Sequence, residues 1–298
     1  MAPIVNPTAT IDLLKRHDLS LTKRLGQHFL VDGNVLRTIL EAADVTPGET
    51  ILEVGPGIGT LTEALLGKGA KVTAVEIDPR LHAILSEEFK ESIESDDLML
   101  VAADALSVLG PHDIAGTSPT KLVANLPYNI APPLMVEYWS RFPSLKQMTV
   151  MVQKEAADRV LASPGIKAYG ALTVKLRSLC RGRRVTSVSR RSFLPPPRVD
   201  STVIQLDRVD LTLDTSRLFP LIEASFSSRR KTIRNNLLSS RASELIGRSI
   251  PADALDASFE TVGLTGGERA ESLDSSQFEA LRNAIQAHRD FPGVGELD

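Results

Sequence analysis

The sequence contains few cysteines, aromatic residues and histidines, and it has no long apolar run. Its single cysteine, Cys180, excludes an internal disulfide framework and is typical of a protein from a reducing cytoplasm. Aromatic residues make up only 4% of the chain, and its five histidines form no cluster with the spacing of a zinc site. No apolar segment reaches the roughly 20 residues that span a bilayer, and the start, MAPIVNPTAT, lacks the pattern of a signal peptide. We therefore expect a cytoplasmic protein without a metal and without a membrane partner.

The length and composition are sufficient for two domains. The chain has 298 residues, 42% of them hydrophobic, and its net charge of −3 alone does not indicate nucleic-acid binding. The patterns described below predict an α/β domain over residues 1–209, in which residues 1–20 form a flexible arm. A smaller α-helical domain follows over residues 210–298. We expect a monomer.

The most informative long segment is residues 51–78, ILEVGPGIGTLTEALLGKGAKVTAVEID. An apolar strand over 51–54 leads into a glycine cluster, and helical apolar spacing follows over 60–66. A second strand over 72–77 carries Glu76 near its end. Strand, glycine turn, helix, strand and acid form the pattern of a nucleoside-binding βαβ unit, in which the acid accepts hydrogen bonds from ribose hydroxyls. We therefore predict a Rossmann-like domain.

The spacing within the glycine turn favours one cofactor. Dinucleotide sites usually read G-x-G-x-x-G, with the pyrophosphate at the helix N-terminus. Here Gly55, Gly57 and Gly59 read G-x-G-x-G, and Glu53 precedes them. An acid beside the turn repels a pyrophosphate but attracts a cationic amine, which favours S-adenosylmethionine over NAD. The alternative is a turn that only makes a tight connection between strand and helix.

A third strand is expected over 98–102, and it ends close to Asp104. The carboxyl end of such a strand lies on the ligand side of a parallel sheet, where the acid can accept from an adenine amino group. The alternative for Asp104 is a helix cap.

The hexapeptide at 125–130, NLPYNI, follows a fourth strand over 121–124. The side-chain oxygen of Asn125 and the backbone carbonyl of Leu126 can accept hydrogen bonds from a planar exocyclic amine. Pro127 has no N–H to donate, and Tyr128 can stack on a base. We predict that these four residues form the catalytic grip on an amino group. The alternative is a simple Asx-Pro turn.

The segment FLPPPRVD, residues 193–200, contains three consecutive prolines after an aromatic residue. A stiff extended loop would hold Phe193 in place to stack on a base, a contact worth about 1–3 kcal/mol. Phe193 is therefore added to the predicted catalytic residues. The alternative is a rigid crossover loop with Phe193 in the core.

Positive charge is densest over residues 227–236, SSRRKTIRNN. We predict that its basic residues bind RNA phosphates, because the run belongs to a chain with a pocket of the size of a base. The alternative is a solvated face. The predicted RNA-binding residues are Arg229, Arg230, Lys231 and Arg234.

Nine segments in this order resemble the KsgA/RsmA/Dim1-type rRNA adenine dimethyltransferases, relatives of the Erm methyltransferases. They cover roughly residues 20–240, and the last of them is more similar to the KsgA branch than to Erm. The segments are LGQHFL (25–30), EVGPGIGTLT (53–62), VEID (75–78), Asp104, NLPYNI (125–130), QKEAADR (153–159), YGALTV (169–174), FLPPPRVDS (193–201) and FSSRRKTIRNNL (226–237).

The resemblance implies a function and a cofactor site. The function is transfer of methyl groups from S-adenosylmethionine to N6 of two adjacent adenines near the 3′ end of 16S rRNA, in the assembling small ribosomal subunit. Three alternatives are an Erm-type 23S rRNA methyltransferase, a non-catalytic RNA-binding assembly factor and a small-molecule N-methyltransferase. Because the family often has Asn at the position of His28, a backbone contact is expected there. The implied cofactor-binding residues are His28, Leu30, Gly55, Glu76, Asp104 and Asn125.

Overall fold

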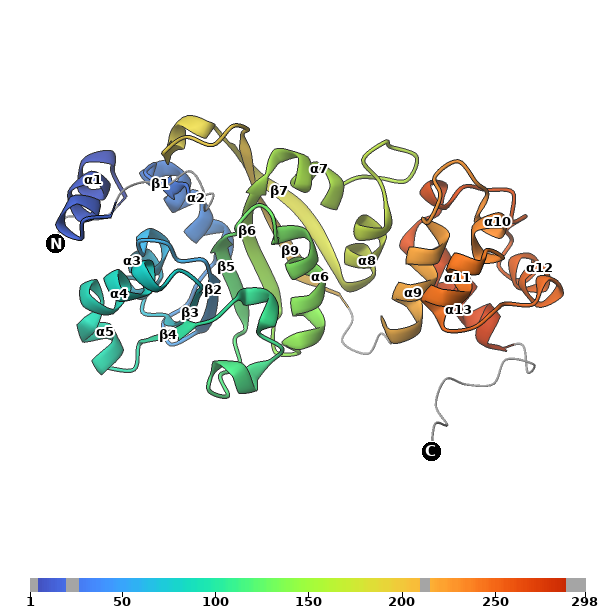
Figure 1. Cartoon of the computed structure of the whole chain (residues 1–298), viewed down its shortest axis with the longest axis horizontal. Helices are drawn as coiled ribbons and strands as arrows, with labels where there is room; N and C mark the ends of the chain where they lie inside the picture. Colours follow the sequence, from blue (N-terminus) through green and yellow to red (C-terminus); the bar gives the residue numbers. More distant parts are fainter. Residues whose placement is uncertain (1–4, 20–26, 210–214, 288–298) are drawn as a thin grey trace. The chain divides into compact units, whose positions relative to one another are not determined.

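The computed structural model describes residues 5–19, 27–209 and 215–287. The chain divides into two compact units, which are drawn in Figure 1. Unit 1 consists of Met1–Asp158 and Arg181–Arg208, and unit 2 consists of Arg159–Cys180 and Val209–Asp298. Residues 159–180, which the sequence-based boundary at 209 assigned to the first domain, therefore belong with the helices of unit 2. Residues 1–4 and 20 of the predicted arm, residues 25–26 of the LGQHFL segment and residues 210–214 after the predicted boundary lie outside the described residues.

Unit 1 is built on a seven-stranded sheet with the order β4-β3-β2-β5-β6-β9-β7. The first five strands in this order are parallel, and β9 pairs with β6 antiparallel. A separate antiparallel pair is formed by β1 and β8. The strands are β1 (Phe29–Leu30), β2 (Thr50–Val54), β3 (Lys71–Glu76), β4 (Leu98–Ala102), β5 (Lys121–Asn125), β6 (Gln147–Gln153), β7 (Cys180–Val188), β8 (Phe193–Leu194) and β9 (Ser201–Arg208).

The strand order reverses at β2, which pairs with β3 on one side and with β5 on the other. Ligands of open α/β sheets bind at such a switch point, outside the carboxyl ends of the strands. The helices that follow these strands connect them in the usual βαβ manner. The helices of unit 1 are α1 (Pro7–Arg16), α2 (Gly33–Ala43), α3 (Thr60–Leu66), α4 (Pro79–Glu88), α5 (Lys90–Glu94) and α6 (Ala131–Arg141), with short 3-10 turns η2 (Ala105–Ser107), η3 (Pro111–Ile114) and η4 (Arg190–Ser192), while α7 (Lys154–Val160) runs across the boundary into unit 2.

Close packing in the core of unit 1 requires glycine at position 59, the third glycine in the turn after β2. Ile51 and Leu65 are fully buried in this core, as the apolar patterns predicted, and so is Leu85 of α4. Gly59 has φ +88°, and a Cβ there would lie 2.3 Å from a ring carbon of Phe89. Any larger residue would push α3 away from the loop after α4, so this glycine serves close packing.

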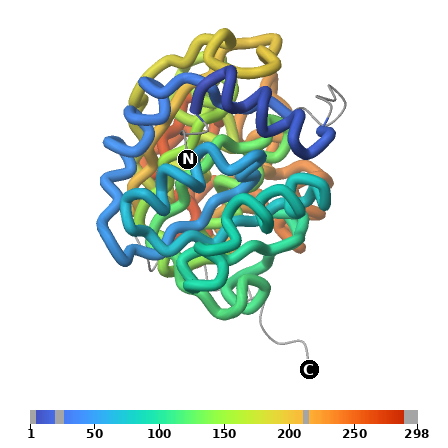
Figure 2. Tube along the Cα trace, turned by 90° about the vertical axis from the view of Figure 1, so that its left-hand side faces the viewer, coloured from blue at the N-terminus to red at the C-terminus, as the bar shows by residue number. Residues whose placement is uncertain are grey.

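The N-terminal segment is a correction to the predicted flexible arm. Residues 7–16 form α1, which begins after Asn6, whose side chain accepts a hydrogen bond from Ala9 N at 2.7 Å. Leu13 and Leu14 are buried in the core of unit 1. The backbone of this helix is drawn in dark blue in Figure 2, and an ion pair of 2.9 Å between Arg16 and Glu88 joins it to α4. The sequence-based prediction of an arm was wrong because no local pattern shows that this helix packs against the domain.

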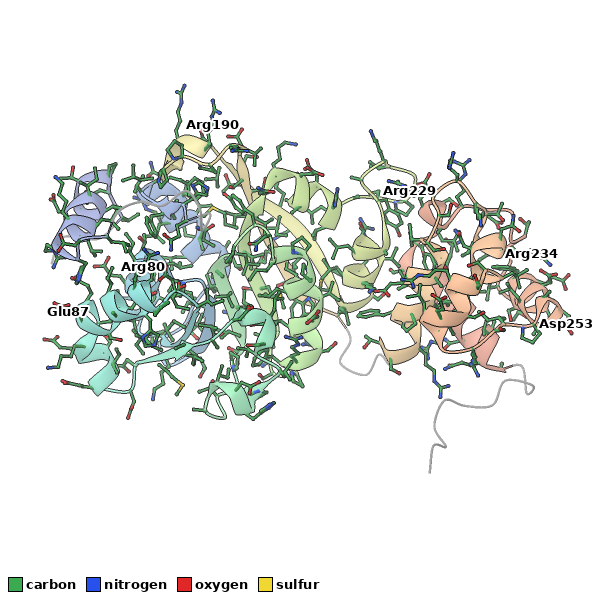
Figure 3. The ribbon with its side chains drawn as sticks, in the orientation of Figure 1. Arg80, Glu87, Arg190, Arg229, Arg234 and Asp253 are labelled. Atoms are coloured by element: carbon green, nitrogen blue, oxygen red, sulfur yellow. The ribbon has the colours of Figure 1, made fainter. Side chains whose placement is uncertain are left out.

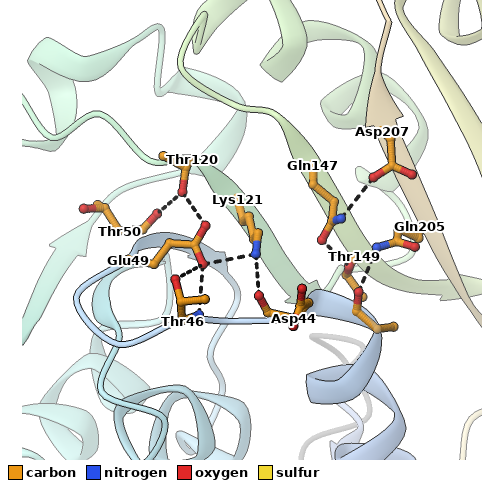
Figure 4. Close-up of polar contacts among 11 residues, drawn as sticks. Asp44, Thr46, Glu49, Thr50, Thr120, Lys121, Gln147, Thr149, Gln205 and Asp207 are labelled. Atoms are coloured by element: carbon orange, nitrogen blue, oxygen red, sulfur yellow. Dashed lines mark hydrogen bonds and ion pairs between the residues drawn. The ribbon is translucent and has the colours of Figure 1, made fainter.

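A polar network fixes the amino ends of β2 and β5, at the edge of the sheet opposite the switch-point crevice (Figure 4). Glu49 accepts hydrogen bonds from Thr46 N (3.1 Å), Thr120 Oγ1 (2.9 Å) and Lys121 Nζ (3.1 Å). Lys121 also donates to the carbonyl of Asp44 at 2.6 Å. Partial burial raises the pKa of Glu49, but these hydrogen bonds outweigh it and lower the pKa overall. The network therefore holds an ionised carboxylate that joins two neighbouring strands.

Unit 2 is a helical bundle around its own core, as predicted for a smaller α domain. The large side chains of Tyr169, Phe259 and Phe278 are fully buried there. The Tyr169 hydroxyl donates to the Leu273 carbonyl at 2.7 Å, which satisfies it inside the core. The helices are α8 (Ala171–Leu179), α9 (Thr215–Ser225), α10 (Ile233–Leu237), α11 (Ser240–Ile246), α12 (Ala252–Thr261) and α13 (Ser275–Ala287), with the 3-10 turn η5 (Ala270–Ser272).

Candidate functional site: a cavity at the switch point of unit 1

The glycine turn after β2 contacts the loop that follows β5. Gly55 has φ +68°, and its N–H donates to the Val75 carbonyl at 3.0 Å. A Cβ at this position would lie 3.3 Å from the Pro127 ring, closer than most real contacts allow. Glycine therefore permits both the left-handed backbone and the close approach of the NLPY segment.

Glu76, the last residue of β3, is oriented by backbone donors. Its side chain is 6% exposed, and its two oxygens accept from Asp78 N at 2.9 Å and from Gly57 N at 3.3 Å. Burial raises the pKa of Glu76, while the two N–H groups oppose that change. The carboxylate thus lies beside the glycine turn in a fixed orientation.

Glu53 is the most buried acid at the site. It is 1% exposed, and its Oε2 accepts a hydrogen bond from Thr62 Oγ1 at 2.7 Å. Burial raises the pKa of Glu53 to about 8, and the charge of Glu76 adds to this effect. At neutral pH and without a cation beside it, Glu53 is mostly protonated.

Asn125 ends β5 with an amide whose oxygen has no partner. Its Nδ2 donates to the His28 carbonyl at 3.4 Å, which assigns the orientation of the amide. Its Oδ1 is buried and accepts no hydrogen bond from any described residue. Such an atom costs about 1–3 kcal/mol in a folded protein unless a ligand pairs with it. The Oδ1 of Asn125 is therefore a ready acceptor for an N–H group.

The residues after Asn125 are fixed by their backbone. Leu126 N donates to the Met151 carbonyl at 3.1 Å, and the Pro127 carbonyl accepts from Ile130 N and Ala131 N, each at 3.1 Å. The tetrapeptide is thereby held between β6 and the start of α6. A rigid peptide of this kind keeps its side chains in place without a ligand.

Tyr128 and His28 pack together at the wall of the site. Their rings are stacked, with centroids 6.1 Å apart and an interplanar angle of 25°. The Tyr128 hydroxyl bonds to Ser201 Oγ at 2.7 Å, and His28 Nδ1 lies 2.7 Å from the Pro195 carbonyl. Because a carbonyl only accepts, Nδ1 of His28 carries a hydrogen and donates it in this bond. His28 is thus held by its side chain against the proline loop, while its backbone carbonyl orients Asn125.

These groups surround one cavity of about 490 Å³ in unit 1, at the carboxyl ends of β2, β3 and β5. Four acids line it, and no Lys or Arg is among the described residues that do so. The lining residues that were predicted from the sequence are His28, Leu30, Gly55, Glu76, Asp104, Asn125, Leu126, Pro127 and Tyr128.

The position of Asp104 is compatible with both roles considered for it, an acceptor for an adenine amino group and a helix cap. Its Oδ1 accepts from Leu106 N at 2.9 Å, so it caps the η2 turn. It also lines the cavity. A carboxylate has further acceptor positions when it caps a turn, so the two roles are compatible.

Phe193 is placed differently from the prediction. It is 3% exposed, belongs to the core of unit 1 and pairs with Leu30 between β8 and β1. It does not belong to the residues that line the cavity. The alternative of a rigid loop with Phe193 in the core therefore describes this conformation, and of the two aromatic residues predicted to stack on a base only Tyr128 lines the cavity.

The motif-based prediction missed two features of the cavity. Thr60, the first residue of α3, is 6% exposed, and its Oγ1 has no hydrogen-bond partner among the described residues. Asp78 binds Arg80 at 2.8 Å and accepts from Gln27 at 2.9 Å, and these bonds lower its pKa. The sequence signal for Thr60 was its place directly after the third glycine.

The basic run in unit 2 divides into two classes. Arg229 and Arg234 are both labelled in Figure 3. Arg229 forms an ion pair of 2.7 Å with Glu271, and Arg234 makes two bonds of 2.6 and 2.8 Å with Asp256. Arg230 and Lys231 are exposed, and no hydrogen bond or ion pair joins their side chains to another described residue. The predicted RNA-binding set therefore contains two arginines with internal partners and two free cations.

The structure shows neither a metal centre nor a membrane span in the parts of the chain that it describes. No group of three or more His, Cys, Asp or Glu side chains in residues 5–19, 27–209 and 215–287 is arranged to hold a metal ion. Within the same ranges, none of the helices combines the length and the apolar character needed to cross a bilayer.

Comparison with known proteins places the chain in a family. Residues 19–259 match the family described as Ribosomal RNA adenine dimethylase. The chain belongs to this family. A relative from Clostridium botulinum (strain Okra / Type B1), named Ribosomal RNA small subunit methyltransferase A, is 35% identical over 280 residues, covering 93% of this chain and 98% of the relative. The protein of the same name from Corynebacterium diphtheriae is 38% identical over 296 residues, covering 96% and 97%.

Solved structures give the same result for this adenine dimethylase. A dimethyladenosine transferase from Plasmodium falciparum has a TM-score of 0.73 at 27% identity, covering 85% of this chain and 96% of that one. The 23S rRNA methyltransferase ErmE has a TM-score of 0.63 at 27% identity, covering 87% and 99%. The family, the α/β fold with a helical domain and the class of enzyme predicted from the sequence, an rRNA adenine methyltransferase, are confirmed.

Proposed function

We propose that the protein transfers methyl groups from S-adenosylmethionine to N6 of two adjacent adenines near the 3′ end of 16S rRNA. The observation that carries this proposal is the buried, unpartnered Oδ1 of Asn125 at the wall of a cavity of base and cofactor size. A hydrogen-bond acceptor in this position suits the amino group of an adenine that has left its stack.

The cavity fits S-adenosylmethionine better than a dinucleotide. Four lining acids and no lining Lys or Arg in the described chain would repel a pyrophosphate, but they suit a ligand with an ammonium and a sulfonium charge. Glu76 would accept from the ribose hydroxyls, Asp104 from the adenine amino group, and Glu53 would face the cationic methionyl end. His28 and Leu30 would contribute backbone contacts. When bound, the cofactor supplies an electrophilic methyl group.

The protein's task at the target adenine is to expose a lone pair. The N6 nitrogen is a poor nucleophile because its lone pair is delocalised into the ring. Asn125 Oδ1 and the Leu126 carbonyl would accept its two hydrogens and favour a pyramidal nitrogen, whose lone pair then points away from them. Positioning and local electrostatics supply the rate, and Tyr128 would stack on the base. The methylated N6 is a cation that releases one proton to solvent. One hydrogen then remains on the neutral nitrogen, so a second transfer is feasible.

The small-subunit assignment is favoured over an Erm-type reaction on 23S rRNA. The relatives named for the small subunit are 35–38% identical to this chain over nearly its whole length. Among the solved structures, the dimethyladenosine transferase and ErmE are both 27% identical to it, but the former has the higher TM-score, 0.73 against 0.63. We propose that the enzyme acts as a cytoplasmic monomer on the assembling small subunit, because one chain provides both the cavity and the exposed cations.

The direct test is nucleoside analysis by mass spectrometry after the protein, labelled S-adenosylmethionine and unmethylated small-subunit particles have been combined. We expect N6,N6-dimethyladenosine at two adjacent positions of 16S rRNA. Label only in 23S rRNA would favour the Erm alternative. RNA binding without label would favour the assembly-factor alternative, and label only in small amines would favour a small-molecule methyltransferase.

The structure also sharpens the prediction for the basic run. Replacing both Arg230 and Lys231 by Glu should weaken rRNA binding at least about tenfold at 0.1 M salt, because two unpaired cations become anions. The affinity for S-adenosylmethionine should not change. Filter binding and calorimetry measure the two affinities.

The matched control for this pair is Arg241→Glu, an exposed arginine of unit 2 that has a local partner in Glu244. It should leave rRNA binding nearly intact. Equal rRNA affinity for wild type and the Arg230/Lys231 variant would assign these residues to a solvated face.

Arg229→Glu should instead lower the stability of unit 2, since it leaves Glu271 next to a like charge.

A further inference from the structure

A second group of arginines belongs to unit 1, whereas the basic run described above belongs to unit 2. Residues 181–200 contain six arginines and a single acid, Asp200. Three of them, Arg190, Arg191 and Arg198, are exposed and flank the short strand β8 on both sides. Arg190 lies on the η4 turn at the periphery of unit 1 (Figure 3). We call these three residues the arginine collar.

The η4 turn is fastened to the segment that follows β1. The Ser192 carbonyl accepts from Val31 N at 2.9 Å, and Ser192 Oγ donates to Asp32 at 2.8 Å. On the other side of β8, Asp200 accepts from Arg190 N at 2.9 Å. These bonds hold the residues at 190–192 and 198–200 together, so the three arginines do not sit on independent loops.

The same segment forms part of the cavity wall. β1 pairs with β8 through Phe29 and Leu194, and His28 bonds to the Pro195 carbonyl at 2.7 Å. His28, Phe29 and Leu30 all line the cavity. The backbone between Arg191 and Arg198 is therefore in direct contact with the wall beside Asn125.

The charges of the collar are not neutralised within the described chain. No hydrogen bond or ion pair joins the three guanidinium groups to another described residue. The nearby acids have other hydrogen-bond partners. Asp32 accepts from Ser192 Oγ and from a backbone N–H at the start of α2, and Asp200 accepts from the backbone N–H of Arg190. Arg184 on β7 differs, because it is paired with Asp158 at 2.7 Å.

We propose that the arginine collar binds the phosphates that flank the target adenine of the RNA. This rests on the proposed function, because the cavity must accept a base. Arginine's planar fork binds phosphate oxygens in pairs, and three such groups beside a base-sized cavity match a short stretch of nucleic-acid backbone. The collar then holds the strand while Asn125 engages the flipped base. It provides a binding site in unit 1, whereas Arg230 and Lys231 belong to unit 2.

The test uses the full-length protein with all three collar arginines replaced by Gln. For a short RNA that contains the two target adenines, we expect KM to rise at least about tenfold with kcat changed less than about threefold. The logarithm of the RNA association constant should fall less steeply with the logarithm of the salt concentration. The magnitude of that slope should decrease by about 2, because three lost contacts count about 0.7 each. Affinity for S-adenosylmethionine should not change. The control replaces the exposed lysines Lys15, Lys68 and Lys71 by Gln and should show none of these effects.

A second experiment tests the contact itself. Methylphosphonate linkages, which are uncharged, replace the phosphates next to the target adenines. Wild type should then lose affinity as the collar variant does, and the two changes combined should cost little more than either alone. The proposed role of the collar would be wrong if the two losses of affinity were fully additive, or if KM were unchanged in the collar variant. Methylation by wild type would still support the proposed function in that case. Absence of methylation by wild type on unmethylated small-subunit particles would overturn the function, and binding of the short RNA would still test the collar.

Discussion

Replacing Asn125 by Ala should reduce methyl transfer to rRNA by about 10²–10³-fold, because the variant lacks an acceptor for the N6 hydrogens. Stability should change little. The Oδ1 atom makes no hydrogen bond inside the described chain, and the bond from Nδ2 to the His28 carbonyl is long, at 3.4 Å. Single-turnover transfer of labelled methyl groups and a thermal melt measure the two effects. Affinity for S-adenosylmethionine, measured by calorimetry, should fall far less than the rate.

Two further variants make this result specific. Asn125→Asp keeps an acceptor oxygen but loses the N–H that bonds to the His28 carbonyl, so it should retain more activity than Ala wherever it stays folded. Asn34→Ala removes an exposed asparagine of α2 and should be fully active. If Asn125→Ala transferred methyl groups at the wild-type rate, the amide would not be the group that binds the target amine.

Replacing Glu53 by Gln should stabilise the ligand-free protein, and more so at high pH. The pKa of Glu53 is about 8 in the folded protein, against an ordinary value of 4.5. Between these values the folded state binds more protons than the unfolded state, so stability falls as pH rises, by about 1.4 kcal/mol per pH unit. Gln carries no charge, and the variant avoids this loss. Urea unfolding from pH 5 to pH 9 should show little difference at pH 5 and a clear gain at pH 8.5.

The same variant should bind S-adenosylmethionine more weakly at pH 8. A cation beside Glu53 lowers its pKa, so binding releases a proton and wild-type affinity rises with pH between 6 and 8, by at most about tenfold per unit. The Gln variant should lose most of this rise, and Glu91→Gln, an exposed acid of α5, should keep it. Calorimetry in buffers of different ionisation enthalpy counts the protons. Equal proton release by wild type and Glu53→Gln would show that Glu53 does not face the cation.

The local parts of the site could be predicted from the sequence. β2 and β3 were expected within a residue of their observed ends, because apolar runs bounded by glycine and an acid are local signals. The parallel sheet brings the carboxyl ends of β2, β3 and β5 together. This places Gly55, Glu76 and Asn125 in one cavity although each lies in a separate motif.

The features that the sequence did not reveal depend on contacts between distant residues. Phe193 lies in the core because β8 pairs with β1, a contact between segments about 165 residues apart. Arg229 and Arg234 have acidic partners 42 and 22 residues further along the chain, which no local pattern identifies. The sequence does not show that Thr60 Oγ1 is buried without a hydrogen-bond partner in the described chain, because its burial depends on how the surrounding segments pack.

The most direct test of the account is a crystal structure of the protein with S-adenosylhomocysteine and a short RNA that contains the target adenines. We predict an adenine in the cavity, with its N6 about 2.9 Å from both Asn125 Oδ1 and the Leu126 carbonyl oxygen, and with its ring on Tyr128. The sulfur should lie on the opposite side of N6 from the two oxygens. An adenine bound elsewhere, with Asn125 Oδ1 still unpaired and N6 remote from the sulfur, would contradict the account.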